Sequence, residues 1–215
     1  MTDLELALAA QDCYAERGAA WEQVWDLEGV WVATRQNAAE ERMVAFRGSL
    51  TVEDWYRDLE VLPTHLRGIG WVHSGFARSM VDVLAELRPT LAERSCWLTG
   101  HSLGAARAWI LAGLIVAARD IALPLGIVTF GCPRPGFPRL RRVVGRPTMA
   151  RRTYENAGDP VADVPLRIPF IWPYCDCVTP IGLSVPPAGA PPFGAHHVDL
   201  YVQGVRELAE PAKTG

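Results

Sequence analysis

The feature that most constrains the fold is a serine between two glycines, Gly-His-Ser-Leu-Gly at residues 100–104. A short apolar run, CWLTG from Cys96, precedes it, and a helical pattern, SLGAARAWILAGLIVAARD from Ser102, follows it. The run predicts a buried strand, and the alanine-rich stretch predicts a long helix. A sharp turn between the two strains the serine backbone and needs glycines where side chains would collide. The motif therefore predicts either a nucleophilic serine or a tight packing turn with an incidental serine.

The other apolar segments alternate between strand and helix patterns, which is typical of an α/β sandwich. We expect strands in GVWVAT from Gly29, RMVAFRG from Arg42, LGIVTFG from Leu125 and MARRTYEN from Met149, and a helix in FARSMVDVLAELRPTL from Phe76. The strand from Met149 is polar enough to lie near an edge of the sheet. Residues 1–215 are expected to form one domain, because a single core grows comfortably to this size.

Both ends of the chain are expected to form amphipathic helices, separated from the core pattern by a long loop. The first helix lies in MTDLELALAAQDCYAERG, and the last lies in HHVDLYVQGVRELAE. The last helix is expected to bury one apolar face, made of Val198, Tyr201, Val202, Val205 and Leu208. Residues 160–192 are rich in proline and aromatic residues, which predicts a long irregular loop of the kind that is often functional.

Composition and charge exclude several classes of protein. The chain is 49% apolar and 21% charged, which excludes a disordered or membrane-spanning protein. Its net charge of -3 comes from interspersed charges without a basic stripe, so nucleic acid is not an expected partner. The five cysteines are odd in number and scattered, which predicts reduced thiols rather than a disulfide framework.

The start of the chain and its longest apolar stretch bear on location. Asp3 and Glu5 stand where a secretory signal peptide would carry positive charge. The stretch AWILAGLIVAA from Ala108 is shorter than the roughly 20 residues that span a bilayer. These patterns predict a soluble protein with no transmembrane segment, either cytoplasmic or released without a recognisable signal peptide.

Five motifs occur in the order found in one enzyme family. They are VAFRGS (44–49), VHSGF (72–76), LTGHSLGAA (98–106), VTFGCPRPG (128–136) and DPVADVP (159–165). With these motifs the chain resembles the class 3 lipases from about residue 29 to residue 205. The resemblance implies an α/β-hydrolase fold, with a mostly parallel central sheet flanked by helices, that hydrolyses carboxylic esters of lipids.

The chemistry of ester hydrolysis needs an activated serine. Its hydroxyl is a poor nucleophile until a histidine removes the proton, and the imidazolium then needs a carboxylate to orient and stabilise it. The resemblance implies Ser102 as the nucleophile and Asp159 as the acid, with Asp163 in the same segment but out of register. Closing a local turn is the alternative role of Asp159. The backbone amide of Leu103 is one expected oxyanion donor, and the resemblance supplies Ser49 as the other, although Ser49 also fits an ordinary loop serine.

Two adjacent histidines compete for the role of the base. Helical phase favours His197, which lies four residues before Tyr201 on the apolar side of the last helix. If the first histidine lies in the loop before that helix, its direction is not set by helical phase. The family pattern H-x-[LV]-x-x-Y fits HHVDLY with His196 first. The resemblance therefore implies His196 as the base and leaves His197 as the competitor.

Residues 50–59 resemble the lid helix of the family. Thr51 and Asp54 fit the pattern of a capping box, and the apolar residues on this otherwise charged segment are Leu50, Val52, Trp55 and Leu59. The segment fits a mobile lid and also fits a plain surface helix packed by Trp55.

The sequence thus predicts a serine lipase or carboxylesterase that acts on a lipid or small-molecule ester and touches lipid interfaces transiently. No metal or cofactor is needed for this chemistry. A phospholipase A1, a short-chain esterase and a catalytically silent binding protein of the same fold remain alternatives. Departures from the family at Ala105 and Cys132 bear on substrate preference and remove no catalytic group.

Overall fold

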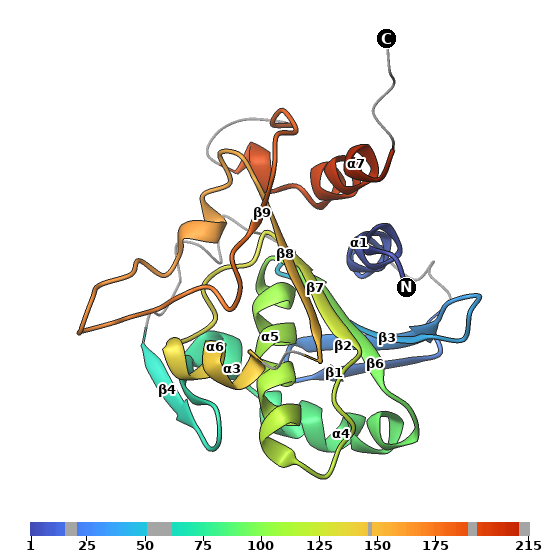
Figure 1. Cartoon of the computed structure of the whole chain (residues 1–215), viewed down its shortest axis with the longest axis vertical. Coiled ribbons are helices and arrows are strands. Elements are labelled where there is room, and N and C mark those ends of the chain that lie inside the picture. Colours follow the sequence, from blue (N-terminus) through green and yellow to red (C-terminus); the bar gives the residue numbers. More distant parts are fainter. Residues whose placement is uncertain (16–20, 51–61, 146–147, 189–192, 211–215) are drawn as a thin grey trace.

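A seven-stranded sheet runs through the molecule in the order β1-β2-β3-β6-β7-β8-β9 (Figure 1). This computed structural model describes residues 1–15, 21–50, 62–145, 148–188 and 193–210. The strands of the sheet are β1 (Gln23–Leu27), β2 (Val30–Gln36), β3 (Arg42–Phe46), β6 (Cys96–His101), β7 (Gly126–Phe130), β8 (Ala150–Asn156) and β9 (Ile181–Leu183). A separate hairpin consists of β4 (Pro63–Leu66) and β5 (Gly70–His73).

The central strands of the sheet are parallel, as the sequence predicts. Strands β3, β6, β7, β8 and β9 run parallel to one another, whereas β1, β2 and β3 are paired antiparallel at one edge. Every residue of β7 is buried, because helices cover both faces of the sheet at its centre. The polar strand β8 has only β9 beyond it, so the prediction that it lies near an edge is confirmed.

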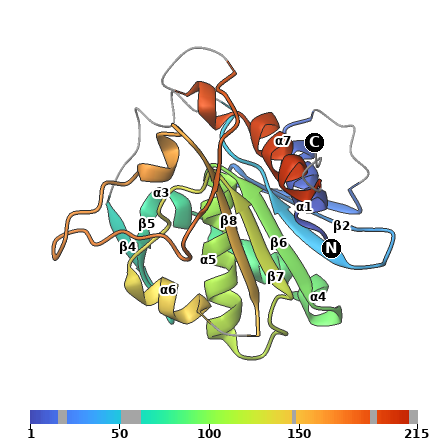
Figure 2. The same cartoon turned by 45° about the horizontal axis from the view of Figure 1, so that its top comes forward.

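Two layers of helices cover the sheet (Figure 2). One face carries α1 (Asp3–Asp12) and α7 (Val198–Ala209), and the other carries α3 (Ser74–Ala77), α4 (Met80–Glu93), α5 (Leu103–Ala118) and α6 (Pro138–Val144). Alternate residues of β3 serve the two cores: Val44 and Phe46 pack with α4 and α5, whereas Met43 and Ala45 pack with α1 and α7. This alternation follows from the two-residue repeat of a strand.

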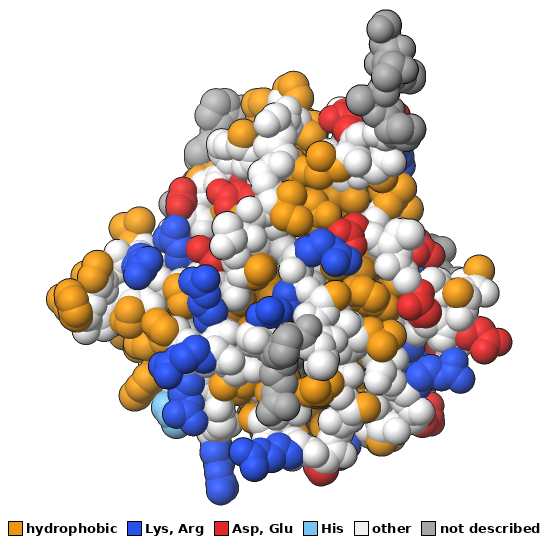
Figure 3. All heavy atoms as spheres, in the orientation of Figure 1, with side chains coloured by type: hydrophobic (Ala, Val, Ile, Leu, Met, Phe, Trp, Pro, Cys, Tyr) orange, Lys and Arg blue, Asp and Glu red, His pale blue; other side chains and the backbone are white. Residues whose placement is uncertain are grey.

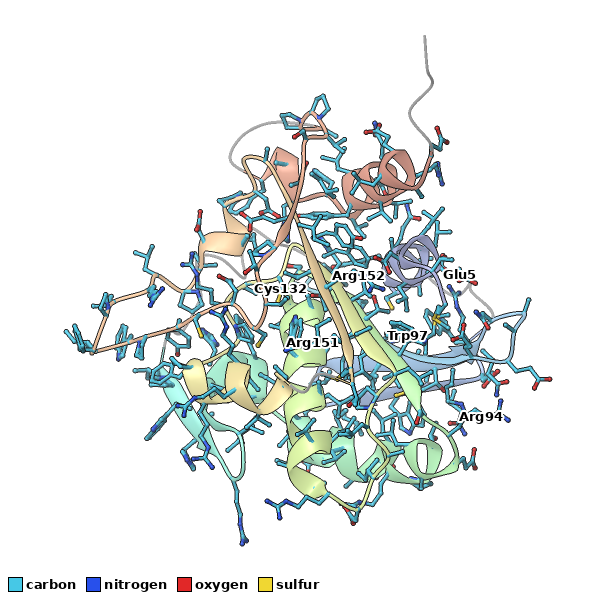
Figure 4. All side chains as sticks on the ribbon, in the orientation of Figure 1. Glu5, Arg94, Trp97, Cys132, Arg151 and Arg152 are labelled. Carbon is cyan, nitrogen blue, oxygen red and sulfur yellow. The ribbon has the colours of Figure 1, made fainter. Side chains whose placement is uncertain are left out.

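The two terminal helices have the predicted position in sequence. Thr2 caps α1 and forms a capping box with Glu5. Arg152 projects from β8 towards α1, where its Nε donates to Asp3 Oδ2 at 2.6 Å (Figure 4). In α7 the predicted apolar face is only partly buried, because Leu208 at its last turn is exposed. No helix among the described residues combines the length and the apolar character that crossing a bilayer requires.

Other predictions need correction. The helix expected from Phe76 is broken, because Ser79 adopts a left-handed conformation (φ +56°) between α3 and α4. The region 160–192 is largely irregular, as predicted, but it contains a short 3-10 turn, η1 (Val161–Asp163), and the edge strand β9. The predicted lid helix over residues 50–59 lies outside the described residues except for Leu50.

Candidate active site

The turn between β6 and α5 holds Ser102 in a strained backbone conformation, with φ +58° and ψ -130°. A Cβ atom added to Gly100 would lie 2.5 Å from the carbonyl carbon of Gly104. A Cβ atom added to Gly104 would lie 2.3 Å from the carbonyl oxygen of Phe46 on β3. Both glycines are therefore required by close backbone contacts, as the motif predicts. The turn presents Ser102 at the carboxyl ends of the parallel strands, where catalytic groups of α/β folds gather.

A buried acid and base meet beyond the end of β8. His196, the last residue of a 3-10 turn, η2 (Gly194–His196), lies with its Nδ1 atom 2.6 Å from Asp159 Oδ2. Asp159 also accepts a hydrogen bond from the Tyr201 hydroxyl, and its Oδ1 accepts the Val161 N–H at 2.8 Å. Since a carboxylate only accepts, Nδ1 of His196 carries the proton and Nε2 is free to act as a base.

The electrostatic environment keeps Asp159 ionised. Burial alone would raise the pKa of this carboxyl group, but the hydrogen bond and charge of His196 outweigh burial. The bonds from Tyr201 and from the Val161 N–H act in the same direction, so the pKa of Asp159 lies below its ordinary value. Asp159 is thus ionised and holds the His196 ring in one orientation.

Ser102 and His196 approach the same point at the end of β7. The Ser102 N–H donates to the carbonyl oxygen of Phe130 at 3.0 Å. A Cβ atom added to the next residue, Gly131, would lie 2.9 Å from Cε1 of His196. Within the described part of the chain, neither Ser102 Oγ nor His196 Nε2 has a hydrogen-bond partner, although both are buried. These are the two atoms between which a proton would pass in a serine hydrolase.

The two competing residues lie apart from this arrangement. Asp163 is exposed and forms a salt bridge with Arg134 at 2.8 Å. His197 is exposed and precedes the first residue of α7, which begins at Val198. Since α7 begins after both histidines, the helical phase that favoured His197 does not apply to either one. The structure thus brings together Ser102, Asp159 and His196.

The expected oxyanion donors lie beside the serine. Leu103 is the first residue of α5, and the first N–H groups of a helix have no partner within it. Ser49 follows Gly48, where an added Cβ atom would lie 3.1 Å from Cβ of Ser102. Ser49 also lines a cavity of about 210 Å³ together with Tyr14, Leu50, His101, Phe193, His196, His197 and Val198. The cavity therefore borders both the base and one expected oxyanion donor.

A chain of hydrogen bonds that the sequence did not predict supports both sides of the site. His101 Nε2 lies 2.8 Å from the carbonyl oxygen of His196, so Nε2 is the protonated nitrogen and donates. Burial lowers the pKa of His101 well below its usual range, so the ring is neutral and Nδ1 accepts a hydrogen bond. Its donor is the hydroxyl of Tyr14 at 2.9 Å, whose oxygen accepts the N–H of Gly48.

This series of hydrogen bonds connects the segment of Ser49 to the backbone of His196, the candidate base. Tyr14 and His101 are 87 positions apart in the sequence, so no local pattern marks their contact. His101 belongs to the serine motif, but at a position that the motif leaves open. Tyr201 was expected in a buried helix face and as the last residue of the family pattern in HHVDLY, but neither observation predicted its hydrogen bond to Asp159.

The sequence profile of the family described as Lipase (class 3) matches residues 43–168. The chain belongs to this family. It is 30% identical over 156 residues to the secreted mono- and diacylglycerol lipase 1 of Fusarium solani, which covers 68% of this chain and 44% of that protein. It is 30% identical over 146 residues to a lipase of Rhizomucor miehei, covering 62% of this chain and 40% of the relative. The chain thus spans less than half the length of the curated relatives it matches.

Solved lipase structures share the fold. The triacylglyceride lipase of Rhizomucor miehei superposes with a TM-score of 0.70 at 23% identity, covering 85% of this chain and 78% of that chain. A triacylglycerol lipase described as having a serine protease triad superposes with a TM-score of 0.67 at 24% identity, covering 76% and 74%. These matches confirm the α/β-hydrolase fold. The expectation of a cytoplasmic protein is contradicted, because the Fusarium solani relative is named as secreted.

Proposed function

We propose that this member of the class 3 lipase family is a serine ester hydrolase that cleaves carboxylic esters of acylglycerols through an acyl-enzyme on Ser102. The observation that carries the proposal is the buried His196–Asp159 pair, joined at 2.6 Å beside a strained serine. The names of the relatives, a mono- and diacylglycerol lipase and a triacylglyceride lipase, support acylglycerols as the substrate class. The secreted relative supports action outside the cell.

In the proposed mechanism Ser102 Oγ attacks the ester carbonyl carbon while His196 Nε2 takes the hydroxyl proton. Asp159 stabilises the imidazolium that forms. The N–H groups of Leu103 and Ser49 bind the negative oxygen of the tetrahedral intermediate. The intermediate collapses, and His196 gives its proton to the departing alcohol. Water then attacks the acyl-enzyme, with His196 again as base, and releases the fatty acid and free Ser102.

Covalent labelling with a fluorophosphonate tests this assignment directly. The wild-type chain is expected to react at Ser102, and Ser102→Ala is expected to lose both the label and ester hydrolysis by several orders of magnitude. A chain that takes no label would be a silent scaffold and would refute the proposal. Activity of Ser102→Ala within tenfold of wild type would place the nucleophile elsewhere. Turnover of triacylglycerol, phosphatidylcholine and a short soluble ester then ranks lipase against phospholipase and esterase.

A paired substitution tests which histidine is the base. We expect His196→Ala to abolish turnover, because Ser102 loses its proton acceptor. His197→Ala is expected to keep at least a tenth of the activity, since this side chain is exposed at the start of α7. The reverse result in two folded variants would move the base to His197 and leave the rest of the mechanism intact.

Contact with lipid is part of the proposal, because acylglycerols with long chains are presented at an interface rather than in free solution. Exposed apolar side chains support such contact. Leu50, which lines the cavity beside Ser49, is exposed, and so is Leu62.

A further inference from the structure

We propose that residues 166–172, here named the apolar loop, insert into an anionic lipid surface and hold the enzyme there. This inference rests on the proposed function for its choice of lipid as partner. The loop leaves the core after Pro165 and returns at Pro173, and it forms the projection at the left of Figure 1. Its four aliphatic and phenyl side chains are exposed: Leu166 by 71%, Ile168 by 41%, Phe170 by 102% and Ile171 by 69%.

An apolar cluster of this kind is unusual on a protein that meets only water. Single exposed apolar residues are common on protein surfaces, but a contiguous group marks a contact site. Elsewhere on the described surface the large exposed apolar residues are scattered, for example Val24 on β1, Val81 on α4 and Leu208 on α7. The apolar loop gathers four of them in six successive residues.

The loop is a formed hairpin and not a loose end. The N–H of Ile168 donates to the carbonyl oxygen of Trp172 at 2.9 Å, and the N–H of Trp172 donates back to Ile168 at 2.9 Å. At the tip Phe170 has a φ of +66°, a conformation that a bulky residue rarely adopts. The base is fixed by the fully buried Tyr174, which packs edge-on against Phe137 at 5.0 Å. The phenyl ring is thus held away from the core by a fixed backbone.

Positive charge lies beside the loop. Exposed arginines are present in the loop at Arg167 and on helix α6 at Arg141. The charges of Arg141 and Arg167 both act on the Cys175 thiol, just after the loop, so both lie near its base. Figure 3 shows Lys and Arg side chains gathered beside the apolar projection.

Two of the acidic residues near the loop base share one arginine. Asp163 lies 2.8 Å from the Arg134 guanidinium, and Asp176 lies 3.9 Å from it. Arg141 and Arg167 form no salt bridge with another described residue, so both present positive charge beside the apolar tip. Apolar side chains that enter the acyl region, flanked by arginines at the headgroup level, match the chemistry of an anionic bilayer or micelle surface.

The position of the loop in the chain connects lipid binding to the site. Pro165 is six residues beyond Asp159, and η1 between them is held by the hydrogen bond from Val161 N–H to the Asp159 carboxylate. Arg134 further ties the loop base to the β7–α6 segment by donating to the carbonyl oxygen of Pro165 at 3.2 Å. Docking of the loop therefore holds the lipid surface at a fixed distance from the acid of the candidate triad.

The test is sedimentation of the full chain with vesicles of ether-linked phosphatidylcholine, alone or with ether-linked phosphatidylglycerol. Ether lipids contain no carboxylic ester, so binding is measured whether or not the chain hydrolyses esters. We expect the wild-type chain to bind the anionic vesicles at least tenfold more tightly than the neutral ones. Phe170→Ser with Ile171→Ser is expected to weaken anionic binding at least tenfold. Arg141→Gln with Arg167→Gln is expected to reduce the preference for phosphatidylglycerol.

Leu208→Ser is the matched control, because Leu208 is 60% exposed on α7, on the opposite face of the sheet. It should bind vesicles within twofold of wild type. All variants should unfold at the wild-type temperature and turn over a short soluble ester within twofold. Equal vesicle binding by the loop variant would overturn the proposal, as would an absence of preference for anionic lipid. A wild-type dimer that the loop substitutions dissociate, without vesicle binding, would instead assign the loop to a second copy of the chain.

Discussion

Replacing Tyr14 by Phe removes one hydroxyl group from the hydrogen-bond chain behind the candidate site. The hydroxyl donates to His101 Nδ1 at 2.9 Å and accepts the N–H of Gly48. Phenylalanine keeps the ring, so its packing against His101 at 5.8 Å is retained. After the substitution the Nδ1 atom and the Gly48 N–H have no partner in this buried position, and the segment that leads to Ser49 loses its anchor.

The size of the effect follows from these contacts. A buried polar group without a partner costs about 1–3 kcal/mol, so the segment around Gly48 is expected to shift to recover a hydrogen bond. A displacement of about 1 Å at a catalytic group lowers the rate about 100-fold. We therefore expect kcat for ester hydrolysis to fall about 10- to 100-fold, which is about 1.4–2.7 kcal/mol of transition-state stabilisation. KM for a short soluble ester should change little, because the walls of the cavity remain.

Steady-state kinetics on a short soluble ester, together with thermal unfolding, measure this prediction. Tyr154→Phe is the matched control, because it also removes a hydroxyl, one that donates to Asp3 at 2.6 Å near the other end of α1. The control is expected to lower stability and leave kcat within twofold. If the kcat of Tyr14→Phe stays within twofold of wild type, the hydrogen bonds of Tyr14 do not position Ser49 and the reasoning is refuted. Equal losses of kcat in both variants would show that the effect is one of general stability.

Three further predictions concern the acid, the serine turn and a buried histidine. Asp159→Asn should lower kcat about 10⁴-fold, because the imidazole of His196 would be held in the wrong tautomer. Asp163→Asn should keep kcat within threefold of wild type. Equal losses of kcat in steady-state kinetics would place the acid elsewhere. Gly104→Ala should reduce the free energy of unfolding by about 1–3 kcal/mol, because the added Cβ atom would lie 2.3 Å from the carbonyl oxygen of Phe46. An unchanged midpoint of urea unfolding would contradict this close contact. Burial lowers the pKa of His73 from 6.5 to about 4. As the pH falls below 6.5, the histidine is protonated in the unfolded chain before it is protonated in the folded chain, so the folded state loses stability. The free energy of unfolding should fall by about 2 kcal/mol at pH 5. A His73→Phe variant whose free energy of unfolding depends on pH as that of the wild type does would refute this prediction.

Local patterns were enough to predict the centre of the fold. The strand, turn and helix around Ser102 were predictable because the two glycines, the apolar run and the alanine-rich stretch lie within 25 successive residues. The choice of His196 over His197 could not come from helical phase, because α7 begins only at Val198. It required the family pattern, and the geometry of the Asp159 contact supports the same residue.

Contacts between distant segments account for what the sequence did not indicate. No residue type near position 14 signals that Tyr14 meets His101, since the pairing depends on how α1 docks on the sheet. The break at Ser79 has no proline or glycine to mark it, and its left-handed conformation is accompanied by a hydrogen bond from its hydroxyl to Glu28. The edge strand β9 is only three residues long, too short for a two-residue repeat to stand out.

The order of the candidate site residues along the sequence sets the order in which the site is assembled. Gln11 of α1 donates to Asp199 of α7 at 2.7 Å, and the rings of Tyr14, just after α1, and Tyr201, on α7, both pack against His101. Synthesis supplies the serine early, the acid later and the histidine last. A growing chain on the ribosome therefore carries Ser102 before His196 has been made, so the proposed triad cannot yet form. In the proposed mechanism the site is complete only when η2 and α7 have been made and α7 has packed against α1.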